Sequence, residues 1–122
     1  MIDHVGLRVA SVAASKRFYG AALEPLGYLI AADYGDDAAG FGAHGRDGRA
    51  DFWVGRGESR GSVHVCFGAK SRADVDAFYK AALAAGGKDN GAPGLRKQYH
   101  PTYYGAFVLD PDGNNVEAVH HG

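Results

Sequence analysis

The feature that most constrains this chain is an internal repeat with an offset of 60 residues. Ten of the 24 positions from 4 to 27 recur unchanged at this offset without a gap. The matched pairs include His4-Val5 with His64-Val65, and Phe18-Tyr19 with Phe78-Tyr79. Such a repeat indicates duplication of one supersecondary unit, which buries its apolar face by packing against its copy. We therefore expect two modules, about 1–57 and 61–121, within a single domain over 1–122.

Each half predicts the same order of elements, a strand, a helix and three more strands. The first half gives a strand over 2–9, a helix over 12–23 capped by Ser11, and strands over 28–32, 39–43 and 50–54, the last two joined by a hairpin turn at Asp47-Gly48. The second half gives a strand over 63–68, a helix over 75–85 with a cap at Ser71, a loop over 88–94, a short strand near 95–99, and strands over 104–109 and 115–120. The expected fold is α+β, with two βαβββ modules paired into an eight-stranded half-open barrel around a shared cavity.

Composition narrows the classes of partner. The chain has 122 residues, 22% of them charged, with a formal net charge of -1 and no run of like charges, so nothing favours nucleic acid or a membrane surface. No apolar run is as long as a membrane span, and the N-terminus enters a strand pattern without a signal peptide. The single cysteine, Cys66, excludes an internal disulfide and favours a reducing compartment, so we expect a cytoplasmic protein.

Three stretches carry a resemblance to a known family. His4 opens the first strand, His64 opens its repeat, and Asp-Pro-Asp-Gly-Asn-Asn-Val-Glu ends at Glu117. Together they resemble the vicinal oxygen chelate superfamily, which includes glyoxalase I, extradiol dioxygenases, fosfomycin and bleomycin resistance proteins, and methylmalonyl-CoA epimerase. The resemblance covers essentially the whole chain. It implies that His4, His64 and Glu117 bind one divalent metal ion.

The chemistry of the residues supports the same trio. Two imidazoles and one carboxylate suit Mn, Fe, Ni, Co or Zn, and three protein ligands leave positions open for substrate and water. Duplication places His4 and His64 in equivalent positions, and strand alternation puts Glu117 on the same face as Asn115. The alternative is that the histidines are remnants of duplication at a rim or in the core, with Glu117 merely exposed.

A fourth ligand is expected only in glyoxalase I itself, where the resemblance implies a Glu on the last strand of the first module. Aligning Asp47-Gly48 with Asp112-Gly113 puts Phe52 at the position equivalent to Glu117, and Phe cannot bind a metal. Asp51 is one residue out of register, which turns its side chain to the other face. We therefore expect a three-ligand site with Phe52 beside the substrate.

Other candidates lie near these ligands in the pattern. Arg8 shares a strand face with His4, where the resemblance implies an Arg that binds an anionic substrate, although it could equally reach solvent. Cys66 shares a face with His64 and is a substrate-binding candidate, or a small packing residue. His100 and Tyr103 are candidates, with Glu117, for catalytic acid or base, or for plain loop packing. Residues expected to lie outside the cavity or to have no role are Trp53, His120 and His121.

Three classes of function follow. The first is a metal-dependent lyase, isomerase or group-transfer enzyme acting on a small anionic, oxygen-rich substrate. The second is a metal-free drug-binding protein of the bleomycin-resistance kind, and the third is an extradiol dioxygenase. The intact His-His-Glu set favours the first class. The resemblance also implies a homodimer.

Overall fold

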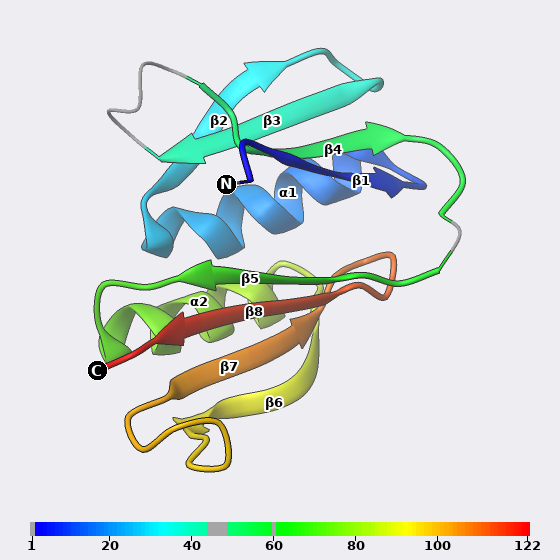
Figure 1. Ribbon diagram of the computed structural model, residues 1–122. Coiled ribbons are helices and arrows are strands. Elements are labelled where there is room, and N and C mark those ends of the chain that lie inside the picture. The colour runs from blue at the N-terminus through cyan, green and yellow to red at the C-terminus, as the bar shows by residue number, and fades with distance from the viewer. Residues whose placement is uncertain (1, 44–48, 60) are drawn as a thin grey trace.

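Two copies of a βαβββ unit follow one another along the chain (Figure 1). The computed structural model describes residues 2–43, 49–59 and 61–122. The first unit contains β1 (Val5–Val9), α1 (Val12–Leu23), a short 3-10 helix (Glu24–Leu26), β2 (Tyr28–Asp33), β3 (Ala38–Ala43) and β4 (Phe52–Arg56). The second contains β5 (His64–Gly68), α2 (Arg72–Ala84), β6 (Lys88–Leu95), β7 (Tyr104–Leu109) and β8 (Asn115–His120). The expected turn at Asp47-Gly48 lies outside the described residues.

The two units have the same topology. Their sheets have the strand orders β1-β4-β3-β2 and β5-β8-β7-β6. In each, the first strand pairs in parallel with the last strand, and the remaining pairs are antiparallel. The α+β class and the paired βαβββ modules are confirmed. The eight strands are divided between two four-stranded sheets, so they do not close a barrel.

Both helices begin where a serine caps them. The Ser11 hydroxyl accepts a hydrogen bond from the backbone N–H of Ala14 at 3.1 Å, and the Ser71 hydroxyl accepts one from Asp74 at 3.1 Å. Each hydroxyl satisfies an N–H group that has no partner within the helix. Because Ser71 is the cap itself, α2 starts at Arg72, three residues earlier than the apolar pattern indicated.

The prediction of a loop over 88–94 was wrong, because this segment forms most of β6. Glycine and proline disfavour a strand locally, and periodicity therefore gave no strand signal there. Antiparallel pairing with β7 decides the structure instead, with register shifts on both sides of Gly91, whose φ is 147°. Residues 96–99, where a short strand was expected, lie beyond the end of β6.

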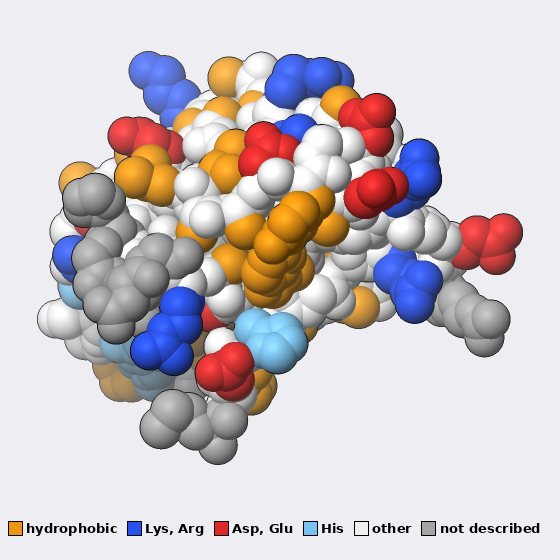
Figure 2. Space-filling model, turned by 90° about the horizontal axis from the view of Figure 1, so that it is seen from above, with side chains coloured by type: hydrophobic (Ala, Val, Ile, Leu, Met, Phe, Trp, Pro, Cys, Tyr) orange, Lys and Arg blue, Asp and Glu red, His pale blue; other side chains and the backbone are white. Residues whose placement is uncertain are grey.

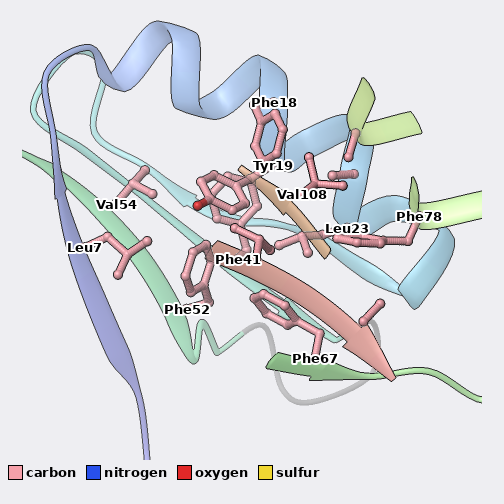
Figure 3. Packing of buried hydrophobic residues seen from close by; sticks show 14 of the residues in the cluster. Leu7, Phe18, Tyr19, Leu23, Phe41, Phe52, Val54, Phe67, Phe78 and Val108 are labelled. Carbon is pink, nitrogen blue, oxygen red and sulfur yellow. The ribbon is translucent and has the colours of Figure 1, made fainter. Parts of the chain in front are cut away.

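The hydrophobic core joins the two units. Aromatic rings from both sheets meet in it: the Phe52 ring of β4 lies 5.2 Å from the Phe67 ring of β5, and the Tyr19 ring of α1 lies 4.8 Å from Phe52 (Figure 3). Burying each such side chain stabilises the fold by about 1.5–3 kcal/mol. The faces that carry these rings therefore point toward each other and toward the helices. The opposite face of each sheet points away from the core.

Hydrogen bonds also tie the turn between β7 and β8 to the first unit. The buried Tyr19 hydroxyl donates to Asp110 at 2.5 Å, and the backbone N–H of Ala10 donates to Asp112 at 2.9 Å. Asp110 also accepts from the Asn114 backbone and side chain, at 2.8 and 2.9 Å. The Asp-Pro-Asp-Gly motif thus fastens the two modules together.

Neither helix of the described residues is long and apolar enough to cross a membrane.

Candidate functional site

A buried carboxylate, Glu117, lies at the centre of the candidate site. Glu117 is 2% exposed and lies in the middle of β8. One oxygen, Oε1, is 2.8 Å from Nε2 of His64, and the other, Oε2, accepts a hydrogen bond from the Tyr103 hydroxyl. Burying a carboxylate costs free energy unless hydrogen bonds compensate for its lost water. Both oxygens of Glu117 are compensated, from opposite sides.

Strand register brings this pair together. β5 and β8 run in parallel with Cys66 opposite Glu117 and His64 opposite Asn115. Partners in register point to the same face, so alternation puts His64, Cys66 and Glu117 on the side away from the core. His64 begins its strand and keeps 52% of its side chain exposed. The expected contact of His64 with Glu117 is therefore present, with His64 open to a ligand.

His4 lies apart from this pair. It precedes β1, and its Nδ1 is 2.8 Å from the Asp3 carboxylate. His4 and His64 line the same open cavity of about 430 Å³, between the N-terminal segment and β5. In residues 2–43, 49–59 and 61–122, however, no group of three or more His, Cys, Asp or Glu side chains could hold a metal ion. The structure thus brings together two of the three expected ligands.

The alignment that made Phe52 the first-module equivalent of Glu117 was wrong by one residue. In the second sheet Cys66 pairs with Glu117, and in the first sheet Gly6, which is 60 residues earlier, pairs with Trp53. Trp53 therefore occupies the equivalent position, on the face away from the core. Phe52 is 1% exposed, packed in the core, and reaches only the inner wall of the cavity. The loop between β3 and β4 is longer than the one between β7 and β8, which shifts the register.

Trp53 has room on this face because its neighbours in the sheet are glycines. Gly6 and Gly40 pair with it, and a Cβ at Gly40 would lie 2.9 Å from the indole ring. The indole stacks on Tyr34, with ring centroids 6.2 Å apart and planes at 12°. The equivalent position of the fourth ligand is therefore filled by an aromatic platform. Neither Tyr34 nor this stack was found from the sequence.

Arg8 does not share the cavity of His4. It lines a second cavity, of about 610 Å³, with residues of the connection between the modules, including Glu58, Ser59 and Ser62. Its side chain runs along Gly57, where a Cβ would lie 2.9 Å from an Arg8 guanidinium nitrogen. Arg8 belongs to β1, whereas His4 precedes the strand. Arg8 as a substrate-binding residue stays a prediction.

Cys66 lies beside Glu117 and is kept protonated. Its pKa is raised to about 12, first because packed protein replaces water around the thiol and then because Glu117 places negative charge beside it. A thiolate is the reactive form of cysteine. Cys66 can therefore line a substrate site as a small neutral group, and its surroundings disfavour a nucleophilic role.

Tyr103 is held as a hydrogen-bond donor. Burial first, and then the hydrogen bond to Glu117, raise the pKa of its phenol above the ordinary value. It therefore stays protonated at neutral pH and does not supply a base. His100 packs edge-on to the Tyr103 ring at 5.2 Å, and its Nε2 is 2.7 Å from Nδ1 of His121. His121, which was expected to have no role, belongs to this cluster. No local pattern could have revealed it, because the contact spans 21 residues.

Comparison with known proteins identifies the family. A model of the Glyoxalase/Bleomycin resistance protein/Dioxygenase superfamily matches residues 1–118. The chain belongs to this superfamily. No match was found among curated proteins.

Solved structures of this superfamily are similar over nearly the whole chain. A glyoxalase/bleomycin resistance protein from Albidiferax ferrireducens T118 has 28% identity and a TM-score of 0.82, with 97% of each chain covered. A glyoxalase/bleomycin resistance protein/dioxygenase family enzyme from Burkholderia phytofirmans PsJN has 20% identity and a TM-score of 0.75, covering 99% of this chain and 98% of that one. The lactoylglutathione lyase of Agrobacterium tumefaciens has 19% identity and a TM-score of 0.70, covering 98% and 92%.

The side chains of His64 and Glu117 are chemically suited to bind a divalent metal ion. The imidazole Nε2 of His64 and the Oε1 carboxylate oxygen of Glu117 lie 2.8 Å apart, and His64 lines the open cavity. Imidazole and carboxylate are ligands of Mn, Fe, Ni, Co and Zn. His64 and Glu117 would hold the ion, and a third protein ligand has to approach them.

Proposed function

We propose that this protein is a metal-dependent glyoxalase-like enzyme, a lyase, isomerase or group-transfer catalyst acting on a small anionic, oxygen-rich substrate. The observation that carries the proposal is the buried Glu117 carboxylate in contact with a half-exposed imidazole. Hydrogen bonds hold this carboxylate in place, and the half-exposed imidazole beside it lines an open cavity from which an ion can reach the pair. A divalent ion bound there would supply a Lewis acid for adjacent substrate oxygens.

The chain's own residues have defined parts in this proposal. His64 and Glu117 hold the ion, and Cys66 offers a neutral, compact surface next to them. Tyr103 donates a hydrogen bond to Glu117 and keeps its own proton at neutral pH. Another group must therefore accept the proton in the reaction. His100 has both ring nitrogens engaged, one by the Thr102 backbone N–H at 3.2 Å and the other by His121.

We further propose that a second copy of the chain completes the site by contributing His4. The ligand-bearing faces of both sheets point away from the core of the molecule, which leaves them free to meet a partner. Figure 2 looks onto the first sheet from the side away from α1, where hydrophobic side chains gather next to a histidine and an acidic residue. Near the cavity, Ile2 is 86% exposed and Val5 is 38% exposed. Apolar patches of this kind favour burial in an interface.

One observation favours the alternative of metal-free ligand sequestration, the activity of bleomycin-resistance proteins. Within the described residues of one chain, His4 does not join His64 and Glu117 in a group that could hold a metal. A cavity of about 430 Å³, with aromatic and apolar side chains beside two histidines and two aspartates in its lining, is large enough for a small organic ligand. Metal binding separates the two proposals.

The first prediction tests the metal site. Titration of Mn²⁺, Ni²⁺ and Zn²⁺ into protein purified without a His tag, followed by calorimetry, should give about one equivalent per chain for at least one ion. Glu117→Gln, which keeps the shape and removes the charge, should weaken that binding by at least about tenfold. Asp76→Asn, on the outer surface of α2, is the matched control and should bind like the wild type. Equal affinity in Glu117→Gln and the control would contradict the assignment.

A further inference from the structure

The segment 96–103 and the C-terminal tail together surround one side chain, Tyr103. Its ring packs against three others, Tyr99 at 4.9 Å, His100 at 5.2 Å and His121 at 5.4 Å between centroids. All three approach at steep angles, between 66° and 89°, which is a favourable arrangement for aromatic rings. We call these three residues the aromatic clamp.

Hydrogen bonds fix the clamp itself. The backbone N–H of Thr102 donates to Nδ1 of His100, so that nitrogen is an acceptor and Nε2 carries the proton that is donated to His121. The Thr102 hydroxyl also donates to the His121 backbone oxygen at 2.5 Å. The last residues of the chain are thereby fastened to the loop before β7. This network holds the rings that pack against Tyr103, whose hydroxyl reaches Glu117.

Gly105 on β7 leaves room for the phenol ring of Tyr103. A Cβ at this position would lie 3.1 Å from a ring carbon of Tyr103 and 3.4 Å from Oε2 of Glu117. Contacts as close as 3.1 Å require the neighbour to shift. Glycine at position 105 therefore lets the phenol lie over the sheet and reach the carboxylate.

We propose that Tyr103 is a positioning residue that assigns different tasks to the two oxygens of Glu117. Its hydroxyl engages Oε2, which turns Oε1 toward His64 and reserves it for the ligand that the two residues share. The clamp makes this arrangement permanent, because Tyr103 cannot turn away without breaking its ring contacts. The inference rests on the proposed function in that the shared ligand is a divalent metal ion.

A preorganised carboxylate binds a metal more tightly than a free one, because less conformational freedom is lost on binding. Loss of a hydrogen-bond partner behind a metal ligand commonly reduces metal affinity by about 10–100-fold. Tyr103→Phe keeps the ring in the clamp and removes only the hydroxyl. It is therefore expected to weaken metal binding by about tenfold while the fold stays intact.

The matched control is Tyr104→Phe, the next residue along the chain. The Tyr104 hydroxyl donates to Asp76 at 2.6 Å, away from Glu117, so this change should leave metal affinity unaltered. Gly105→Ala is a second test, because it displaces the Tyr103 ring and keeps the hydroxyl. It should weaken metal binding in the same direction as Tyr103→Phe.

A second readout requires no metal. Long-range ¹H–¹⁵N spectra of the metal-free protein should show His64 protonated at Nε2 in the wild type and in Tyr104→Phe, because Glu117 accepts from that nitrogen. In Tyr103→Phe, Glu117 is free to turn, and the His64 signals should move toward an average of the two tautomers. Unchanged His64 signals would overturn the positioning role, whether or not a metal binds.

The metal titration separates the two proposals. Tight binding by the wild type with equal or higher affinity in Tyr103→Phe would overturn the positioning role and leave the metal site standing. Absence of binding in the wild type would overturn the metal-dependent function, and the ¹⁵N spectra would then decide alone whether Tyr103 positions Glu117. A tenfold loss in Tyr103→Phe, with Tyr104→Phe like the wild type, supports both.

Discussion

At the scale of single residues, the neighbourhood of Glu117 determines what each side chain can do. Burial first, and then the neighbouring Glu117 carboxylate, raise the pKa of Cys66 and of Tyr103, and both groups therefore keep their protons. The sequence indicated Cys66 and Tyr103 as candidates because their positions in the strand pattern were right. It could not indicate their protonation, which depends on burial in the folded protein and on a charge 14 to 51 residues away in the chain.

Cys66 provides a prediction at this scale. With a pKa of about 12 against an ordinary 9.0, the thiol has a smaller thiolate fraction at pH 8 than a free thiol. Alkylation by iodoacetamide at pH 8 should be at least about tenfold slower than for the urea-unfolded chain, and should accelerate as the pH rises toward 12. Protein partly surrounds the thiol, so the pH dependence of the rate separates protonation from access: a raised pKa predicts a rate that keeps rising toward pH 12.

Removal of the neighbouring charge is the control for this measurement. Glu117→Gln should speed alkylation of the folded protein at pH 9, because the second cause of the raised pKa is lost. A wild-type rate at pH 8 equal to that of the unfolded chain would contradict the raised pKa. The folded state prefers the neutral thiol, so this group's contribution to stability is complete below pH 9.0 and is lost as the pH rises toward 12.

At the scale of elements, the helices and sheets were predictable where local signals were strong. Ser11 and the apolar period gave α1 with the bounds that the structure has, and β7 and β8 were also correct at both ends. The error at β6 has the opposite cause, because glycine and proline conceal a strand that exists through pairing with β7. The predicted register of β4 was wrong by one residue, because more residues separate β3 from β4 than separate β7 from β8.

The close packing around Gly87, between the end of α2 and the start of β6, gives a prediction at the scale of elements. A Cβ at Gly87 would lie 2.5 Å from Val108 Cγ1 and 2.7 Å from Phe18 Cε1, side chains from the two different modules. Gly87→Ala should therefore lower the free energy of unfolding in urea by about 1–3 kcal/mol. Gly20→Ala, inside α1 with nothing within 4 Å of the new Cβ, should raise it by about 0.5–1 kcal/mol. A stabilising Gly87→Ala would mean that the modules do not approach as closely as described.

At the scale of the whole molecule, the arrangement of the modules decides where the ligands can meet. The two sheets share one core through Phe52, Phe67 and the helices, and the faces bearing Trp53 and Glu117 look outward. The proposed partner contributes His4 to the His64–Glu117 pair. A site of this kind is shared between two chains in a twofold dimer, with each chain supplying part of two sites.

Mixing two defective variants tests this arrangement. His4→Ala and Glu117→Ala should each lose tight metal binding when pure. After unfolding and refolding of an equal mixture, heterodimers carry one site with all its ligands, so about a quarter of the wild-type capacity should return. Capacity that stays at the level of the separate variants, or sedimentation of the wild type only as a monomer, would contradict a site shared between chains.

The sequence by itself determined the duplication, the capped helices, the βαβββ order of elements in each module and the types of side chain proposed for the candidate site. These follow from the 60-residue repeat, from hydroxyl caps and from apolar periodicity, all of which act over a few residues or by copying. The tertiary structure alone decided that Trp53 rather than Phe52 is the counterpart of Glu117, that His121 holds Tyr103, and that His4 stands apart from His64 and Glu117. These outcomes depend on loop length, on strand pairing and on which sheet faces are buried against each other. Such contacts join residues that are distant in the chain, so no local pattern encodes them.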